Sequence, residues 1–109
     1  MNAQFIDLDN TEQLEKLFES SHQKPVILFK HSTTCPISAN VFEDVSQTDA
    51  TIYLIVVQEA RNVSNAIAEK TGIRHESPQA IVLRNGEAIY HASHYDVTHS
   101  DIADAIAKG

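Results

Sequence analysis

The chain has 109 residues and a mass of 12.1 kDa, the usual size of a single domain, and we expect one domain over residues 1–109. Hydrophobic residues make up 42% and charged residues 21%, which argues against a disordered or fibrous protein. Eight Lys and Arg against fifteen Asp and Glu give a net charge of −7 without any basic run, so no nucleic acid partner is expected.

Two further features limit the class of protein. The longest apolar runs, Val26–Phe29 and Ile52–Val57, are far shorter than the roughly 20 residues that span a bilayer, so no membrane partner is expected. The first residues lack the basic and apolar stretches of a secretory signal, and we expect a cytoplasmic location. The single cysteine, Cys35, excludes an intramolecular disulfide and a cysteine-rich zinc site.

The first half of the chain alternates predicted strands and helices. Residues 4–8 form a short strand-like segment, and either Asp9 or Asn10 is expected to cap a helix that ends before Pro25. Residues 25–30 form a continuous apolar run with β-branched and aromatic members, which predicts a central strand buried on both faces.

Three more elements follow. Cys35 and Pro36 open a second helix that fades near residues 47–49, and residues 51–57 form a second apolar strand. A third helix is predicted over residues 62–71, with Gly72 as the residue that terminates it.

The last third of the chain predicts a hairpin and a closing helix. Residues 80–83 and 87–91 flank Asn85-Gly86, a strong signal for a type I′ turn between antiparallel strands. Thr98 then caps an amphipathic helix that includes Ile102. The full order is βαβαβαββα, which predicts an α/β domain with a mixed central sheet flanked by helices.

The chemistry of this sequence centres on Cys35. Pro36 suits the first position of a helix, which makes Cys35 the N-cap and places its sulfur near unpaired amides and the positive end of the helix dipole. Both effects favour thiolate over thiol. Ser38 lies three residues later in the same turn, where a dithiol enzyme has its resolving cysteine, and its hydroxyl can donate to a sulfur anion.

These residues resemble a known family. The element order, the cysteine that opens the second helix and the proline before the hairpin are similar to the thioredoxin fold. The string Thr34-Cys35-Pro36-Ile37-Ser38 resembles the signature of the monothiol bacilliredoxins. The resemblance implies a bacillithiol-system protein of the stress response that acts as a monothiol thiol-disulfide oxidoreductase. Phe29 stands where dithiol thioredoxins carry a buried acid, which agrees with the absence of a resolving cysteine.

The resemblance also implies substrates and partners. Cys35 would attack a client protein's mixed disulfide with bacillithiol and take the bacillithiol onto itself. Bacillithiol would be a thiol co-substrate, no cofactor would be bound, and a second low-molecular-weight thiol or a redox enzyme would regenerate Cys35. By position, Ser77 and a cis Pro78 would bind the substrate, and Thr33, Thr34 and Pro36 would line the same groove.

Other interpretations stay open. A thioredoxin-like module that binds extended peptides beside Ser77 and Pro78 without redox chemistry is the alternative function. His31 and His75 are placed to stabilise a thiolate but are equally compatible with surface loops. A further set of side chains near the C-terminus matches no metal-ligand spacing, so no metal is expected; these are His91, His94, Asp96, His99 and Asp101.

Overall fold

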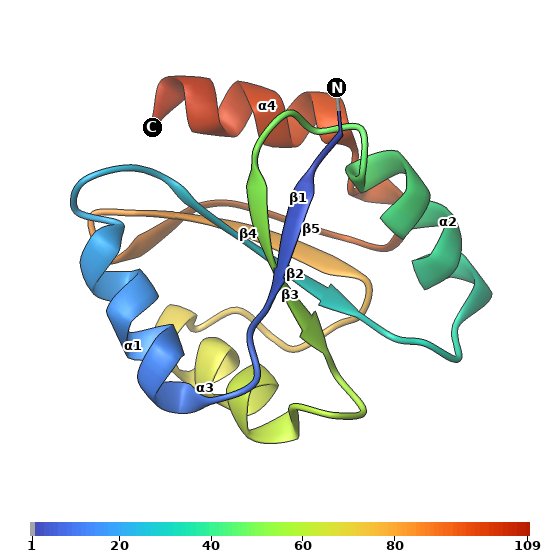
Figure 1. The fold of residues 1–109 in the computed structure, drawn as a ribbon, viewed down its shortest axis with the longest axis horizontal. Helices are drawn as coiled ribbons and strands as arrows, with labels where there is room; N and C mark the ends of the chain where they lie inside the picture. The colour runs from blue at the N-terminus through green and yellow to red at the C-terminus, as the bar shows by residue number, and fades with distance from the viewer. Residues whose placement is uncertain (1) are drawn as a thin grey trace.

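The computed structural model describes residues 2–109, which form a five-stranded sheet covered by helices on both faces (Figure 1). The strands are β1 (Gln4–Asp7), β2 (Val26–His31), β3 (Thr51–Val56), β4 (Gln79–Arg84) and β5 (Glu87–Ser93). The helices are α1 (Thr11–Ser20), α2 (Pro36–Val45), α3 (Arg61–Thr71), the short 3-10 helix η1 (His94–Asp96) and α4 (His99–Lys108).

The sheet is mixed, with the strand order β1-β3-β2-β4-β5. β2 pairs in parallel with β3, which pairs in parallel with β1 at the edge. On its other side β2 pairs antiparallel with β4, and Lys30 lies opposite Gln79 in this register. The predicted central strand and the α/β architecture are therefore confirmed, since β2 lies in the middle of the sheet and its first five residues are all buried.

The two faces of the sheet have separate apolar cores. α1 and α3 cover one face, where Leu14 and Ile67 pack with Leu28 of β2. α2 and α4 cover the other face, where Val41 and Ile102 pack with strand residues that include Phe29. Figure 1 shows these two helix pairs on opposite sides of the sheet. Because side chains alternate along a strand, successive residues of β2 enter different cores.

Most of the predicted caps and turns are confirmed. Of the two N-cap candidates for α1, Asn10 is the one whose side chain accepts the Gln13 amide hydrogen, at 2.8 Å. Gly72 ends α3 in the left-handed conformation with φ 73°. Asn85 and Gly86 both have positive φ, 57° and 76°, as a type I′ turn requires.

The structure differs from the sequence predictions mainly where elements end. β4 and β5 extend to Gln79 and Ser93, so the hairpin is longer than residues 80–91. The short helix η1 was not predicted, because three residues with a positive φ at His94 carry no periodic apolar pattern.

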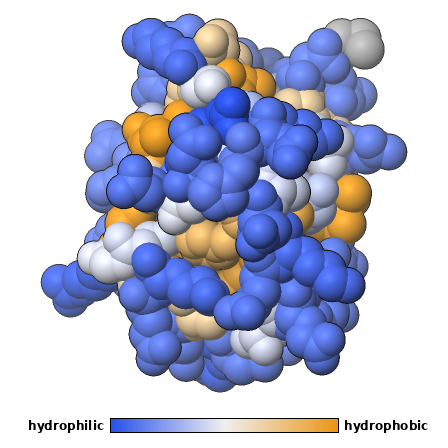
Figure 2. All heavy atoms as spheres, turned by 90° about the vertical axis from the view of Figure 1, so that its left-hand side faces the viewer, coloured by the Kyte–Doolittle hydropathy of each residue, from blue (hydrophilic) through white to orange (hydrophobic). Residues whose placement is uncertain are grey.

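The surface around α1 is mainly polar. Figure 2 shows the face that carries α1 as mostly hydrophilic, with small apolar patches between the hydrophilic side chains. Within residues 2–109, no helix is both long and apolar enough to cross a membrane.

The cap of α1 provides a test of the first turn of the fold. Asn10→Ala removes the acceptor for the Gln13 amide, and we expect a loss of about 1 kcal/mol in the free energy of unfolding. Asp9→Ala is the matched control, with an expected change below about 0.5 kcal/mol. Urea denaturation measures both variants, and equal losses would contradict the assignment of Asn10 as the cap.

Candidate functional site

Cys35 follows β2, and Pro78 directly precedes the neighbouring strand β4. Both residues lie at the same end of these two strands. β2 ends at His31, shortly before Cys35, and the antiparallel strand β4 begins at Gln79, directly after Pro78. Since Lys30 pairs with Gln79, the end of β2 and the start of β4 lie side by side. The Ser77–Pro78 peptide bond is cis, as the family resemblance implied.

Cys35 is the N-cap of α2. Its φ and ψ of −105° and 118° are extended, Pro36 occupies the first helical turn, and the thiol is half-buried. The predicted backbone position is therefore confirmed. Within the described chain, the Cys35 side chain makes no capping hydrogen bond, so the sulfur has no fixed partner. The positive end of the α2 dipole still favours an anion at this position.

Ser38 is fully buried, and its hydroxyl is committed to the connection between β2 and α2. Its Oγ lies 2.8 Å from His31 Nδ1 and accepts a hydrogen bond from the Ser32 amide at 3.0 Å. The hydrogen bond to Cys35 that the three-residue spacing suggested is not formed among residues 2–109. A buried hydroxyl must find partners inside the protein, and those within reach are on the preceding strand and loop.

The loop before Cys35 is held by a glutamine that the sequence analysis did not identify. Gln58 donates to Ser32 Oγ at 2.8 Å and to Thr34 Oγ1 at 3.1 Å, and accepts from the Thr33 amide at 3.3 Å. Thr33, Thr34 and Pro36 are all exposed beside Cys35. These hydrogen bonds therefore order a surface that is open to a partner.

The short helix η1 joins the two parts of the site. The His94 amide donates to the Pro78 carbonyl at 2.8 Å, and Asn40 of α2 donates to the Tyr95 hydroxyl at 3.2 Å. η1 thus connects the turn that contains Pro78 with the helix that begins at Cys35. Tyr95 is 61% exposed, and its ring forms part of the surface at this edge.

A buried polar cluster supports the site from the opposite face of the sheet. The Lys30 side chain is 1% exposed, and its ammonium donates to the Ser64 carbonyl at 3.1 Å and lies 3.2 Å from His75 Nδ1. Ser64 Oγ lies 3.0 Å from the same nitrogen. These contacts tie α3 to the segment that leads to Pro78.

Burial and charge explain the ionisation of this cluster. Burial lowers the pKa of Lys30 to about 8. The pKa of His75 is also lowered, first by burial and then by the positive charge of Lys30. A neutral His75 is consistent with two donors directed at its Nδ1.

One of the histidines near the C-terminus joins two helices. His99 Nδ1 lies 3.0 Å from Asp44 Oδ1, and the His99 amide donates to Asp44 Oδ2 at 3.0 Å. This pair connects the start of α4 to α2. Among the residues that the structure describes, no group of three His, Cys, Asp or Glu side chains could hold a metal ion.

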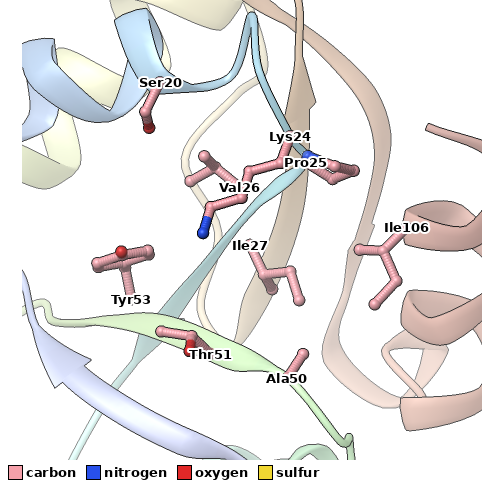
Figure 3. Close-up of a pocket in the computed structure, with 9 residues that line it drawn as sticks. All are labelled: Ser20, Lys24, Pro25, Val26, Ile27, Ala50, Thr51, Tyr53 and Ile106. Atoms are coloured by element: carbon pink, nitrogen blue, oxygen red, sulfur yellow. The ribbon is translucent and has the colours of Figure 1, made fainter.

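A pocket of about 330 Å³ lies at the other end of the sheet (Figure 3). Its walls come from α1, α4 and the first residues of β2 and β3, including Val26, Thr51 and Ile106. β2 runs from this pocket toward Cys35, and its six residues span about 20 Å. The pocket is therefore separate from the thiol, which lies on an open surface accessible to another protein.

The sequence analysis missed several residues that order the site. Gln58 and Tyr95 are far in sequence from Cys35, and only tertiary structure brings them to this region; Lys30 is near in sequence, but its partners Ser64 and His75 are not. The one available signal was a charged residue at the end of an otherwise apolar buried strand, because buried charges require partners.

The fold and the sequence agree with known proteins. Residues 6–102 match the family model described as Monothiol bacilliredoxin BrxC. A solved structure described as a proposed oxidoreductase with a thioredoxin fold is 39% identical, covers 93% of this chain and 92% of that chain, and has a TM-score of 0.85. A thioredoxin from Schistosoma mansoni is 22% identical, covers 96% of this chain and 94% of that chain, and has a TM-score of 0.70. At that identity, the second likeness shows the fold alone.

The buried Lys30 predicts a specific pH dependence of stability. Its pKa of about 8 lies below the ordinary 10.5, so the unfolded chain holds more protons between these values. The free energy of unfolding should therefore rise with pH across this window, by about 2 kcal/mol between pH 7 and 9.5. Lys30→Met should lack this rise, and urea denaturation of both proteins at pH 7 and 9.5 measures the difference. Parallel changes in the two proteins would contradict the assignment.

Proposed function

The chain belongs to the monothiol bacilliredoxin family, and we propose that it removes bacillithiol from mixed disulfides with client proteins. Family membership makes it a thiol-dependent redox protein with a thioredoxin fold. The observation that carries the finer proposal is the half-buried Cys35 at the N-cap of α2, with Ser38 in place of a second thiol. A redox role accounts for this cysteine better than peptide binding alone does, because an N-cap favours the thiolate nucleophile.

The first step exchanges one disulfide for another. The Cys35 thiolate attacks the bacillithiol sulfur of the client's mixed disulfide, and a bond forms between Cys35 Sγ and that sulfur as the original S–S bond breaks. The client cysteine leaves as a thiolate and takes a proton from water. The number of disulfides does not change in this step, so no further oxidant or reductant is needed.

The second step requires a thiol from outside the chain. Cys35 is the only cysteine in the sequence, so no intramolecular thiol can attack the mixed disulfide on it. A second bacillithiol thiolate attacks the bound bacillithiol sulfur, releases the Cys35 thiolate and forms bacillithiol disulfide. A redox enzyme that supplies a thiol would regenerate Cys35 in the same way.

The exposed surface around Cys35 would bind the client. We propose that Thr33, Thr34 and Pro36 flank an extended client segment whose backbone pairs with Ser77 beside Pro78. The support for this is that three segments meet there: the β2–α2 loop, the cis-proline turn and η1. We also propose that the chain acts as a single domain in the cytoplasm.

The direct test uses a client protein carrying one bacillithiolated cysteine. Wild-type protein should remove the adduct and gain the bacillithiol mass on Cys35, whereas Cys35→Ser should lose at least 99% of this activity because its hydroxyl is a far weaker nucleophile. Intact-mass spectrometry follows both chains. Lys24→Gln, in the distant pocket, is the control and should act as wild type. Removal of the adduct by Cys35→Ser would refute the proposal, and stable client binding without transfer would favour the peptide-binding module.

The monothiol assignment has its own test at position 38. Ser38→Cys places a second thiol in the same helical turn, and we expect it to displace bacillithiol from Cys35 and form an intramolecular disulfide without any added thiol. Ser38→Ala is the matched control and should retain the adduct. Mass spectrometry of the isolated mixed disulfide distinguishes the two results. Persistence of the adduct in Ser38→Cys would show that this turn cannot bring the two sulfurs together.

A further inference from the structure

The Ser38 hydroxyl can donate only one hydrogen bond, so its other contacts must be bonds that it accepts. A serine hydroxyl has one hydrogen to donate and two positions that accept. The Ser32 amide, which can only donate, occupies one accepting position. The contact of 2.8 Å with His31 Nδ1 runs in either direction, depending on whether that nitrogen carries a hydrogen.

The two states of His31 therefore have different consequences. When Nδ1 is unprotonated, Ser38 donates its hydrogen to it and has none left for any other atom. When Nδ1 carries a hydrogen, it donates to Ser38 Oγ, and the hydroxyl hydrogen is free to point elsewhere. Cys35 is the N-cap of the turn that contains Ser38, and an N-cap side chain reaches the amides of the second and third helical residues. Rotation about the Cys35 Cα–Cβ bond would direct Sγ toward this turn.

We propose that His31 is a positioning residue that controls the ionisation of Cys35 through Ser38. In the structure Cys35 Sγ makes no side-chain capping hydrogen bond; when the thiol side chain rotates to Ser38, its S–H would donate to Ser38 Oγ while Oγ donates to His31 Nδ1. Ionisation moves one proton from Sγ to Nδ1 by way of Oγ, after which Nδ1 donates to Oγ and Oγ donates to the thiolate. Atoms and charge balance without another reactant. The inference rests on the proposed function of Cys35 as the nucleophile.

The surroundings of His31 isolate this interaction. Its ring packs between Phe29 of β2 and Phe42 of α2, with centroid distances of 6.2 and 4.9 Å, and neither is charged. Val56, its register partner on β3, is also uncharged. Burial lowers the pKa of His31, so the ring is neutral at neutral pH.

Two charged groups on elements next to His31 have partners of their own. Lys30 bonds with Ser64 and His75 on the opposite face of the sheet. Asp44 of α2 bonds with His99, and on the η1 side the Tyr95 hydroxyl accepts from Asn40. Ser38 is therefore the polar side chain in contact with His31 among residues 2–109.

The test measures Cys35 alkylation by iodoacetamide against pH in the full chain. Where His31 titrates, the wild-type rate should fall by less than tenfold per pH unit, because each proton gained by His31 favours the remaining thiolate. His31→Phe, which keeps the aromatic packing, and Ser38→Ala should both fall tenfold per unit throughout. At pH 6, Ser38→Ala should react about threefold more slowly than wild type.

A second measurement keeps the proposal falsifiable. NMR measures the titration of the His31 ring. The ring should titrate at higher pH in wild type than in Cys35→Ser, because a thiolate favours the protonated ring. This difference should shrink when Ser38→Ala is also present. A wild-type pH profile that persists in Ser38→Ala would overturn the relay in favour of direct charge attraction. Identical His31 titration in wild type and Cys35→Ser would also overturn it. Neither assay uses bacillithiol, so failure of the proposed function would not affect them.

Discussion

The central strand β2 has no exposed face over its first five residues, and this constraint shapes the site. A strand that is buried on both sides alternates its side chains between two cores, so any polar residue on it needs an internal partner. Lys30 enters the core under α3 and bonds with Ser64 and His75. His31, the next residue, points to the α2 face and meets Ser38. At the end of β2, Lys30 on one face of the sheet and His31 on the other thus contact the two parts of the candidate site.

This arrangement relates the fold to the chemistry at Cys35. The contacts of Lys30 lead to the segment before Pro78, and those of His31 lead to the first turn of α2. Phe29, one position earlier on the α2 face, is fully buried and packs against the His31 and Phe42 rings. Because Phe29 is apolar, His31 is the titratable side chain that contacts Ser38. The chain has no second cysteine whose thiol would need to be deprotonated.

Much of the fold could be predicted because its signals are local. Pro36 and the Asn85-Gly86 pair act through their own backbone positions, and the structure places each as the sequence indicated. Asn10 is one of the two N-cap candidates that the sequence offered for α1. The backbone position of Cys35 was predictable for the same reason. The partners of Ser38 were not, because spacing along a helix indicates which residues share a turn but not where a hydroxyl directs its hydrogen. Gln58 and η1 depend on packing between distant segments, which no local pattern encodes.

The single thiol of this chain, on Cys35, has a kinetic consequence. A pair of thiols in one chain reacts at a rate that is independent of concentration, because the second thiol is always present beside the first. In this chain each release of an adduct from Cys35 requires a collision, so its rate is second order and proportional to the supply of free thiol around it. Under the proposed function, the lifetime of the capped state would therefore lengthen as that supply falls.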